Sequence, residues 1–375
     1  MKKVVIAIDS FKGCLPSAEV GKAAAEGIRS VYPECEVICL PIADGGEGML
    51  DVLIMATNGQ EVPISAHDPL MRWRNTYYGI SENGETAFIE MASISGLPLV
   101  PPERRNPMLT TTYGTGEIIR DALERGCRNF IIGIGGSATN DAGLGMLQAL
   151  GFRFSDKEGK EVGTGRGEVL IKVAHIDSTC VHPALNSCRF TVACDVQNPF
   201  YGPEGAAYVF APQKGADREM VEALDAGLQN FAEVIRHTTG KDISHHPGAG
   251  AAGGMGGSLL AFLNAELKPG IQLMLEALDF SNKIKSADLI ITGEGKADRQ
   301  TLMGKVPSGI LAEARKQNIP VILLAGNIED SDELQQAGFE GVFSVNPPFI
   351  SLEEAMRPEV ACKNIQQTVE SICKK

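Results

Sequence analysis

The chain has 375 residues, more than one ordinary hydrophobic core accommodates, so we expect two domains. A formal net charge of -13 argues against nucleic acid or an anionic membrane surface as a partner. The nine cysteines include no C-x-x-C pair, and no apolar run is long enough for a signal peptide or a membrane span. We therefore expect a cytoplasmic protein without a zinc site or a disulfide framework.

The first part of the chain has the pattern of a parallel α/β unit. Apolar residues predict buried strands at 4–8 and 36–42, with a helix from Pro16 to about Val31 between them. Polar residues follow both strands: Asp9, Ser10 and Lys12 after the first, Asp44 and Glu47 after the second. Parallel sheets bind ligands at these strand ends, although an acid there can equally cap a helix.

From residue 60 the pattern changes to short strands at 62–67, 73–80 and 86–91, separated by turn residues. Such runs are typical of an antiparallel or mixed sheet, so we place a domain boundary near residues 58–60. A helix at 116–125 then leads into the most informative stretch of the chain.

That stretch is RNFIIGIGGSATNDAGLGMLQAL, residues 128–150. A buried strand, a glycine turn and a helix N-terminus in succession predict an anion site, because free backbone N–H groups and a positive helix dipole would face the ligand. The glycines allow close approach, and small polar side chains can bind oxygen atoms. The residues concerned are Gly135, Gly136, Ser137, Asn140 and Asp141.

Two other interpretations of this stretch remain open. The spacing of Gly133, Gly135 and Ala138 also fits a dinucleotide-binding fold, which would make the protein an NAD-dependent dehydrogenase. However, residues 152–155 alternate between apolar and polar, as a half-exposed antiparallel strand does, whereas the second strand of a Rossmann unit is buried and parallel. The other interpretation is a tight turn that binds nothing.

The rest of the chain adds further polar loops. A strand at 188–193 ends at Asp195, a later loop carries Lys214, and a long helix is expected at 219–237. The segment PGAGAAGGMGG contains Gly253 and Gly254 and runs into an apolar helix, as a second glycine turn at a helix N-terminus would.

The sequence pattern of a parallel α/β unit appears again from about residue 287. Strands are expected at 287–292, 321–325 and 342–345, with Glu294 and Lys296 after the first of them. The first segment holds too few strands for a sheet of its own. We therefore predict a discontinuous Rossmann-like α/β domain with a parallel sheet, residues 1–59 and 285–375, and an inserted α/β domain with a mixed sheet, residues 60–284.

The chemistry of these residues favours phosphoryl transfer. The sequence contains no G-x-x-x-x-G-K-[ST] loop, no protein-kinase signature and no G-x-S-x-G elbow. What remains is several acids, a few lysines and glycine turns that could hold phosphates. Phosphoryl transfer needs this inventory: positioned phosphates, a carboxylate that holds magnesium, cations for developing charge and a carboxylate near the acceptor hydroxyl.

Seven blocks in order also resemble the bacterial type I glycerate kinases. They are DSFKG at 9–13, ADGGEG at 43–48, GGSATND at 135–141, CDV-x-NP at 194–199, PQKG at 212–215, PGAGAAGG at 247–254 and TGEG at 292–295. The resemblance implies a Rossmann-like domain and a second α/β domain with a cleft between them. It also implies ATP-dependent phosphorylation of D-glycerate, giving 2-phospho-D-glycerate, with 3-phosphoglycerate as the other possible product.

Roles of single residues follow from chemistry. We expect Asp195 to be the likelier general base and Asp44 to hold metal or substrate, with both as Mg²⁺ ligands and Lys12 as a further catalytic group. Glycerate would be bound by Ser10, Lys12, Asp44 and Lys214. The phosphates and the nucleotide would be bound by Gly135, Gly136, Ser137, Asn140, Asp141, Gly253, Gly254, Glu294 and Lys296.

The cofactors expected are ATP and Mg²⁺, and the protein is expected to be a monomer or homodimer that binds neither nucleic acid nor membrane. A non-catalytic sensor of a small acid or nucleotide is the competing class. A sensor has no use for several acids around an anionic ligand, because like charges oppose its binding.

Overall fold

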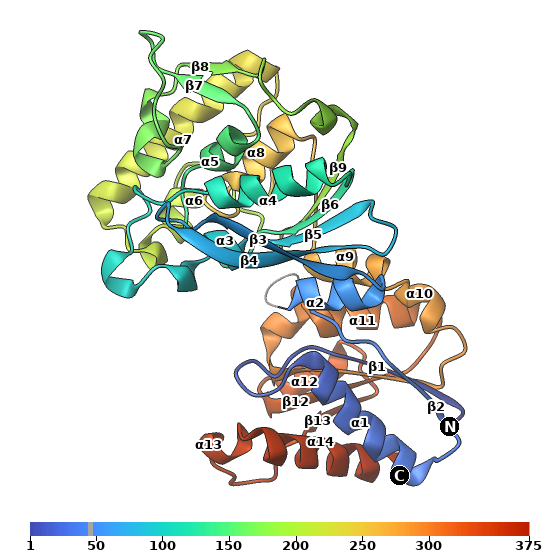
Figure 1. The fold of residues 1–375 in the computed structure, drawn as a ribbon. Helices are drawn as coiled ribbons and strands as arrows, with labels where there is room; N and C mark the ends of the chain where they lie inside the picture. The colour runs from blue at the N-terminus through green and yellow to red at the C-terminus, as the bar shows by residue number, and fades with distance from the viewer. Residues whose placement is uncertain (44–47, 375) are drawn as a thin grey trace. The chain divides into compact units, whose positions relative to one another are not determined.

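The computed structural model describes residues 1–43 and 48–374, which form two compact units, Met1–Asp44 with Ile271–Lys375 and Gly45–Gly270 (Figure 1). The expected class, a discontinuous parallel α/β unit with an inserted mixed-sheet unit, is confirmed. Asp44 lies outside the described residues, as do Gly45, Gly46 and Glu47 of the same predicted loop.

The first unit is built on a five-stranded parallel sheet in the order β13-β12-β11-β1-β2. Its strands are β1 (Lys3–Ile8), β2 (Glu36–Cys39), β11 (Leu289–Ala297), β12 (Val321–Ile328) and β13 (Gly341–Ser344). β1 is an interior strand between β11 and β2, and its side chains from Val4 to Ile8 are almost completely buried, as expected of a strand covered on both faces.

Helices cover both faces of this sheet. α1 (Ser17–Val31) and α14 (Pro358–Cys373) lie side by side, and Gly27 permits this approach because a Cβ there would meet the carbonyl oxygen of Gln366 (Figure 1). α11 (Val306–Arg315) packs on the other face. The unit also contains α9 (Gly270–Ala277), α10 (Phe280–Lys283), η6 (Arg299–Leu302), α12 (Ser331–Gln336) and α13 (Leu352–Ala355).

The second unit has a six-stranded mixed sheet in the order β10-β9-β6-β5-β4-β3. β4 is antiparallel to both of its neighbours, and the other pairs among β5, β6, β9 and β10 are parallel. The strands are β3 (Gln60–His67), β4 (Trp73–Ile80), β5 (Thr86–Glu90), β6 (Asn129–Gly133), β9 (Arg189–Ala193) and β10 (Glu266–Lys268). A separate antiparallel pair consists of β7 (Arg153–Ser155) and β8 (His175–Asp177), as the alternating pattern predicted.

Neighbouring residues of β4 show how this sheet is covered. Tyr78 points to one face and donates its hydroxyl to Asp121 of α4 (Tyr113–Glu124), whereas Gly79 points to the other face, against Leu50 and Ile54 of α2 (Met49–Ala56). The other helices are α3 (Ala92–Ser95), η1 (Leu97–Leu99), η2 (Pro102–Arg104), α5 (Leu144–Ala149), η3 (Gly167–Lys172), η4 (Pro183–Ser187), α6 (Ala206–Phe210), η5 (Pro212–Lys214), α7 (Arg218–Thr239) and α8 (Met255–Phe262).

The division between the units differs from the sequence-based boundaries by about one helix at each crossing. Residues 48–59 belong to the second unit, because α2 packs on β4 and the backbone N–H of Leu50 donates to Glu90 at 2.8 Å. Residues 271–284 belong to the first unit, because Ile271 packs against Gly309 of α11.

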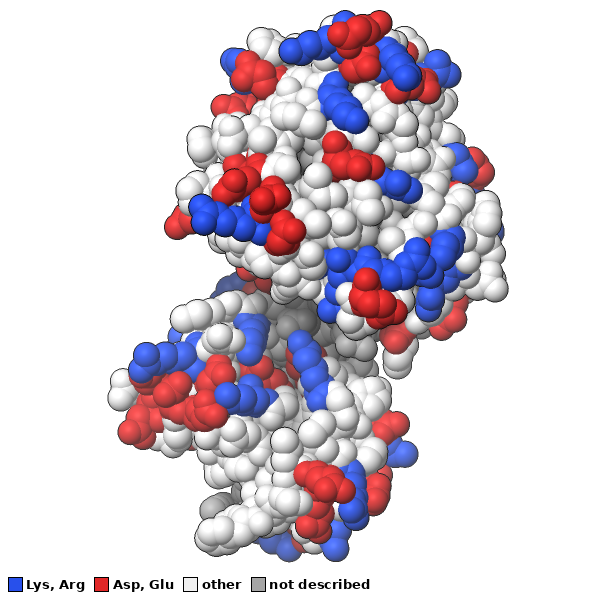
Figure 2. Space-filling model, turned by 90° about the vertical axis from the view of Figure 1, so that its left-hand side faces the viewer, with Lys and Arg blue, Asp and Glu red and all other residues white. Residues whose placement is uncertain are grey.

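Charged side chains of both signs are interspersed on the surface. Figure 2 shows clusters in which Lys and Arg lie next to Asp and Glu, separated by wide uncharged areas. Arg218–Glu222 and Arg299–Glu333 are ion pairs of the protein surface. Among residues 1–43 and 48–374, no helix combines the length and apolar character that a membrane span requires.

Candidate functional site

The carboxyl edge of the parallel sheet in the first unit contains a topological switch point. The chain leaves β1 toward β2 on one side, while β11 pairs with β1 on the other side. The loop after β1 begins with Asp9, whose backbone N–H donates to the carbonyl oxygen of Gly293 in β11 at 2.9 Å. Open α/β sheets bind ligands in the crevice at such a point.

A cavity of about 890 Å³ opens at this edge. Its polar lining comes from the ends of β1, β11, β12 and β13 and from the residue before α11, namely Asp9, Ser10, Lys12, Glu294, Lys296, Lys305, Asn327, Ser344 and Asn346. An apolar wall, made of Pro347, Pro348, Ile350, Leu352 and Met356, completes it. The structure thus brings together four of the residues predicted from the sequence, Ser10, Lys12, Glu294 and Lys296.

Glu294 is a buried carboxylate of this cavity. It is 8% exposed, and its Oε2 accepts a hydrogen bond from Lys305 Nζ at 3.3 Å, whereas its buried Oε1 has no hydrogen-bond partner among the described residues. Burial raises the pKa of Glu294, and Thr301 and Lys305 lower it by smaller amounts. A carboxylate with a raised pKa in a cavity is a candidate for acid–base chemistry.

Other charges of the cavity already have protein partners. Lys296 Nζ lies 2.9 Å from Glu329 Oε2 and 3.7 Å from Asp298 Oδ2, which raises the pKa of the lysine. Asp9 is buried, and its Oδ1 accepts from the N–H of Ser10 at 2.7 Å. Lys12 is exposed and also lines the cavity.

The glycine turn of the second unit follows β6. Gly135 and Gly136 are exposed, and the chain then runs through Ser137 to Asn140 as a buried segment. Lys214, from η5, lies beneath this segment: its Nζ donates to Ser137 Oγ and to the carbonyl oxygen of Thr139, each at 2.7 Å. Lys214 is 3% exposed, and burial lowers its pKa to about 7, opposed by the charge of Asp141.

Asp141 binds N–H groups at the N-terminus of α5, which we expected from the sequence to be free for a ligand. Its carboxylate accepts from the N–H groups of Gly143 and Gly145 at the start of α5, and from both the N–H and the hydroxyl of Thr112. Thr112 Oγ1 in turn accepts from the N–H of Met146. These donors are therefore used inside the protein. The completely buried carboxylate of Asp141 caps the helix from two residues before its N-cap, Gly143.

Beside this cap, two side chains lack internal partners. Neither Oδ1 nor Nδ2 of Asn140 has a hydrogen-bond partner within the described part of the chain, and the same holds for Oγ1 of Thr139. Both residues are completely buried. Buried polar atoms are nearly always hydrogen-bonded, so this pair is the strongest indication of a ligand in the second unit.

Gly253 and Gly254 make close contacts with protein rather than with open space. A Cβ at Gly253 would lie 2.1 Å from the carbonyl oxygen of Thr139, and one at Gly254 would lie 2.9 Å from Leu228. Both have a positive φ, so glycine is required there for packing against residues 139–142. Their predicted contact with phosphate has no support from this geometry.

Asp195 is exposed at the end of β9, and its Oδ1 accepts from the N–H of Gly270, the first residue of α9, at 2.8 Å. This hydrogen bond is the structural role that an aspartate at a strand end commonly has. The dehydrogenase alternative fits poorly, because α5 begins only at Leu144, well beyond the Gly133-x-Gly135-x-x-Ala138 motif that should lead directly into a helix.

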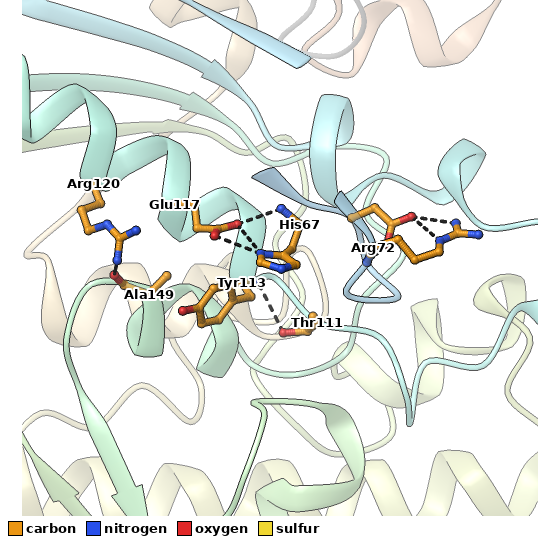
Figure 3. A network of polar contacts seen from close by, with 8 residues as sticks. His67, Arg72, Thr111, Tyr113, Glu117, Arg120 and Ala149 are labelled. Carbon is orange, nitrogen blue, oxygen red and sulfur yellow. Dashed lines mark hydrogen bonds and ion pairs between the residues drawn. The ribbon is translucent and has the colours of Figure 1, made fainter. Parts of the chain in front are cut away.

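Thr110, Thr111 and Thr112 precede α4 and lie next to a polar network that we did not predict from the sequence (Figure 3). Glu117 accepts from the backbone N–H of His67 at 2.8 Å and lies 3.0 Å from its Nδ1, and Tyr113 N–H donates to Thr111 Oγ1 at 3.2 Å. Three successive threonines, 110–112, were the available signal in the sequence. Lys305 was also missed, because it lies in a Gly-Lys pair without a phosphate-loop pattern.

Within residues 1–43 and 48–374, no three His, Cys, Asp or Glu side chains form a cluster that could hold a metal ion. Mg²⁺ in kinases usually needs only one or two carboxylates, since phosphates and water supply the other oxygens.

A parallel α/β unit with a charged cavity at its switch point is the arrangement of an enzyme for a small polar ligand. Residues 4–375 match the model of the glycerate kinase family. The chain is 48% identical to glycerate 2-kinase of Escherichia coli over 95% of this chain and 93% of the relative, and 46% identical to glycerate kinase of Bacillus subtilis over 99% and 96%.

A solved structure, the putative glycerate kinase 2 of Salmonella typhimurium, covers 100% of this chain with 97% of its own, at 44% identity and a TM-score of 0.90. The chain belongs to the glycerate kinase family, as the seven sequence blocks indicated, and it is a kinase that acts on an alcohol group.

Proposed function

We propose that this protein phosphorylates D-glycerate with ATP and Mg²⁺, and that the product is 2-phospho-D-glycerate. The Escherichia coli relative, named glycerate 2-kinase, supports the position of transfer. The single observation that carries the proposal is the charged cavity at the switch point of the first unit, which combines lysines, carboxylates and an apolar wall.

The size and lining of this cavity suit a nucleotide. At about 890 Å³ it is much larger than a three-carbon acid needs and lies in the range of cofactor pockets. The wall formed by Pro347, Ile350 and Met356 can receive an apolar base, and the lysines can hold phosphates. We assign Ser10 and Lys12 to the carboxylate of glycerate, and Glu294, Lys296 and Lys305 to the end of the cavity where phosphate is transferred.

In the second unit we assign phosphate contacts to Gly135, Gly136, Ser137 and Asn140, with Lys214 as the cation behind them. With a pKa of about 7, Lys214 is only partly protonated near neutral pH in the absence of a ligand. An anion close to Ser137 would favour the charged form of Lys214 and would so be stabilised by it.

Mg²⁺, when bound with ATP, would neutralise charge on the phosphates. Asp44 and Asp195 stay our candidates for its protein ligands, although Asp44 lies outside the described residues and Asp195 already accepts a hydrogen bond from Gly270.

The test is direct: incubate the purified protein with ATP, MgCl₂ and D-glycerate, follow ADP formation, and identify the product by phosphorus NMR. We expect the 2-phosphate, whose phosphorus couples to one carbon-bound proton. A 3-phosphate, coupled to two such protons, would correct the position of transfer, and no ADP above the rate without glycerate would contradict the proposal.

A further inference from the structure

The carboxylates of the first unit's cavity differ in what their oxygens contact. Asp9 accepts from the backbone of its own loop, whereas Glu294 has one oxygen on Lys305 and one buried oxygen without a hydrogen-bond partner among the described residues. A buried acceptor without a donor is energetically unfavourable, because it has lost its hydrogen bonds to water and gained none in the protein. A hydroxyl that enters the cavity and donates to Oε1 would remove this cost.

We propose that Glu294 is the general base of the kinase: its carboxylate accepts the proton of the glycerate hydroxyl as that oxygen attacks the γ-phosphorus of ATP. This role presupposes that the protein phosphorylates D-glycerate with ATP, as proposed above. The O–H bond of glycerate and the bond from the γ-phosphorus to the β–γ bridging oxygen break, and a new P–O bond forms. ADP leaves with the electron pair, and the proton passes from Glu294 to water.

Lys305 acts on this reaction through Glu294 and is a positioning residue. Its Nζ holds Oε2 at 3.3 Å, which leaves Oε1 as the oxygen available to the substrate. Its charge also opposes the rise in the pKa of Glu294 that burial causes. Without that charge the base would stay protonated to a higher pH.

Several other charges face Glu294 and bear on its titration. Asp298, from the end of β11, raises the pKa of Glu294, and Asp9, Lys12 and Lys296 line the same cavity. Among these groups, the charge of Lys305 favours the ionised form of Glu294, whereas the charge of Asp298 opposes it.

Asp195, which the sequence favoured as the base, has a weaker geometry for that role. It is exposed and bound to the start of α9, so neither burial nor a missing donor prepares it for proton transfer. An Asp195→Asn variant keeps an oxygen for Gly270 and removes only the charge. The two candidates can therefore be separated by matched carboxylate-to-amide changes.

The experiment compares E294Q, E294D, D195N and K305M in ADP release with D-glycerate, and measures MgATP affinity by calorimetry. E340Q serves as the control, since Glu340 is exposed in the same unit and lines no part of the cavity. We expect E294Q to lower kcat by roughly 10²–10⁴-fold with MgATP affinity within about threefold of the parent, and E294D to recover part of the rate.

The pH profile provides the readout that a structural role would not move. The parent should lose kcat on the acid side as Glu294 is protonated, the residual rate of E294Q should lack this limb, and K305M should move it to higher pH by on the order of one unit. An acid limb that is unchanged in both variants would overturn the assignment.

Two further outcomes would also overturn it: a loss of MgATP affinity in E294Q with normal kcat at saturation, or a larger fall of kcat in D195N than in E294Q. Should the parent itself fail to phosphorylate glycerate, the proposed function is what fails. If the parent is active and E294Q has the same kcat, the proposed function stands and only the role of Glu294 is contradicted.

Discussion

The Nζ atom of Lys214 lies 2.7 Å from the Oγ atom of Ser137, a residue 77 positions earlier in the chain. The same ammonium group donates to the carbonyl oxygen of Thr139, so one buried lysine fixes the whole segment that follows the glycine turn. Because burial lowers the pKa of Lys214 to about 7, this fixing group changes charge near neutral pH.

Lys214 should make the stability of the protein depend on pH. Between the native pKa of about 7 and the unfolded value of 10.5, the unfolded state binds more protons, so the free energy of unfolding rises with pH. Relative to K214M, the parent should gain up to about 1.4 kcal/mol per pH unit between pH 7.5 and 9.5. Urea unfolding at three pH values measures this difference.

The control for this measurement is K157M, which replaces an exposed lysine of the same unit and should follow the pH dependence of the parent. Parallel stability curves for the parent and K214M would show that Lys214 keeps its ordinary charge in the folded state.

A side chain at Gly136 should weaken phosphate binding, in addition to the stability that it costs at a positive φ. It has φ +71°, and an added Cβ would only touch Ala92, so G136A should fold with a loss of about 1–2 kcal/mol. Gly84, at φ +73° with open space around it, provides a matched control with the same backbone cost. We expect weaker MgATP or phosphoglycerate binding in G136A alone, measured by calorimetry. Equal affinities in the two variants would make the loop a simple turn.

Asp141 should contribute to stability more than to binding. D141A removes the acceptor for four donors from Thr112, Gly143 and Gly145, which should lower the free energy of unfolding by about 3 kcal/mol or more. T112V removes the hydroxyl that donates to Asp141 and accepts from Met146 but keeps the backbone N–H, so it should cost about 1–3 kcal/mol. Thermal unfolding with and without MgATP separates the effects. A stable D141A that has lost only nucleotide affinity would restore the phosphate contact predicted from the sequence.

Acceptor specificity should reflect recognition of the carboxylate. Glycerol lacks the group that we assign to Lys12, so it should be a poor acceptor, and L-glycerate presents its hydroxyl on the wrong side of that carboxylate. ADP release with each compound, in the presence of MgCl₂ or of excess EDTA, measures this. Turnover should occur only with D-glycerate and magnesium together, and equal rates with glycerol would remove the role of Lys12.

The sequence was sufficient for most of the fold, because the strands that form the two sheets are marked by burial pattern and by turn residues. The interior strand β1 is continuously apolar from Val4 to Ile8, and β7 alternates, so their parallel and antiparallel environments could be predicted. The boundaries between the two units could not be predicted from the sequence. The assignment of α2 depends on the contact of Leu50 and Ile54 with Gly79, which no local pattern records.

The candidate sites were predicted less completely, since they depend on contacts between distant segments. The acids and glycines were visible as motifs, but the capping role of Asp141 depends on Thr112, and the packing role of Gly253 depends on Thr139. Lys305 follows Glu294 by eleven residues, and only the structure shows that its ammonium group reaches the carboxylate.

The position of β1 has a consequence for the newly made chain. Its hydrogen-bonding partner β11 begins at Leu289, beyond the whole second unit, so the ribosome must add the intervening residues before β1 can pair on that side. At about 5–20 residues per second this takes on the order of tens of seconds. During that time β1 has one open edge, with β2 as the only neighbour yet available, while Gly45–Gly270 emerges as a continuous piece that can fold first. The unit with the chain's first residue is thus the last to be completed, and an apolar strand edge is a site of aggregation or chaperone binding until then.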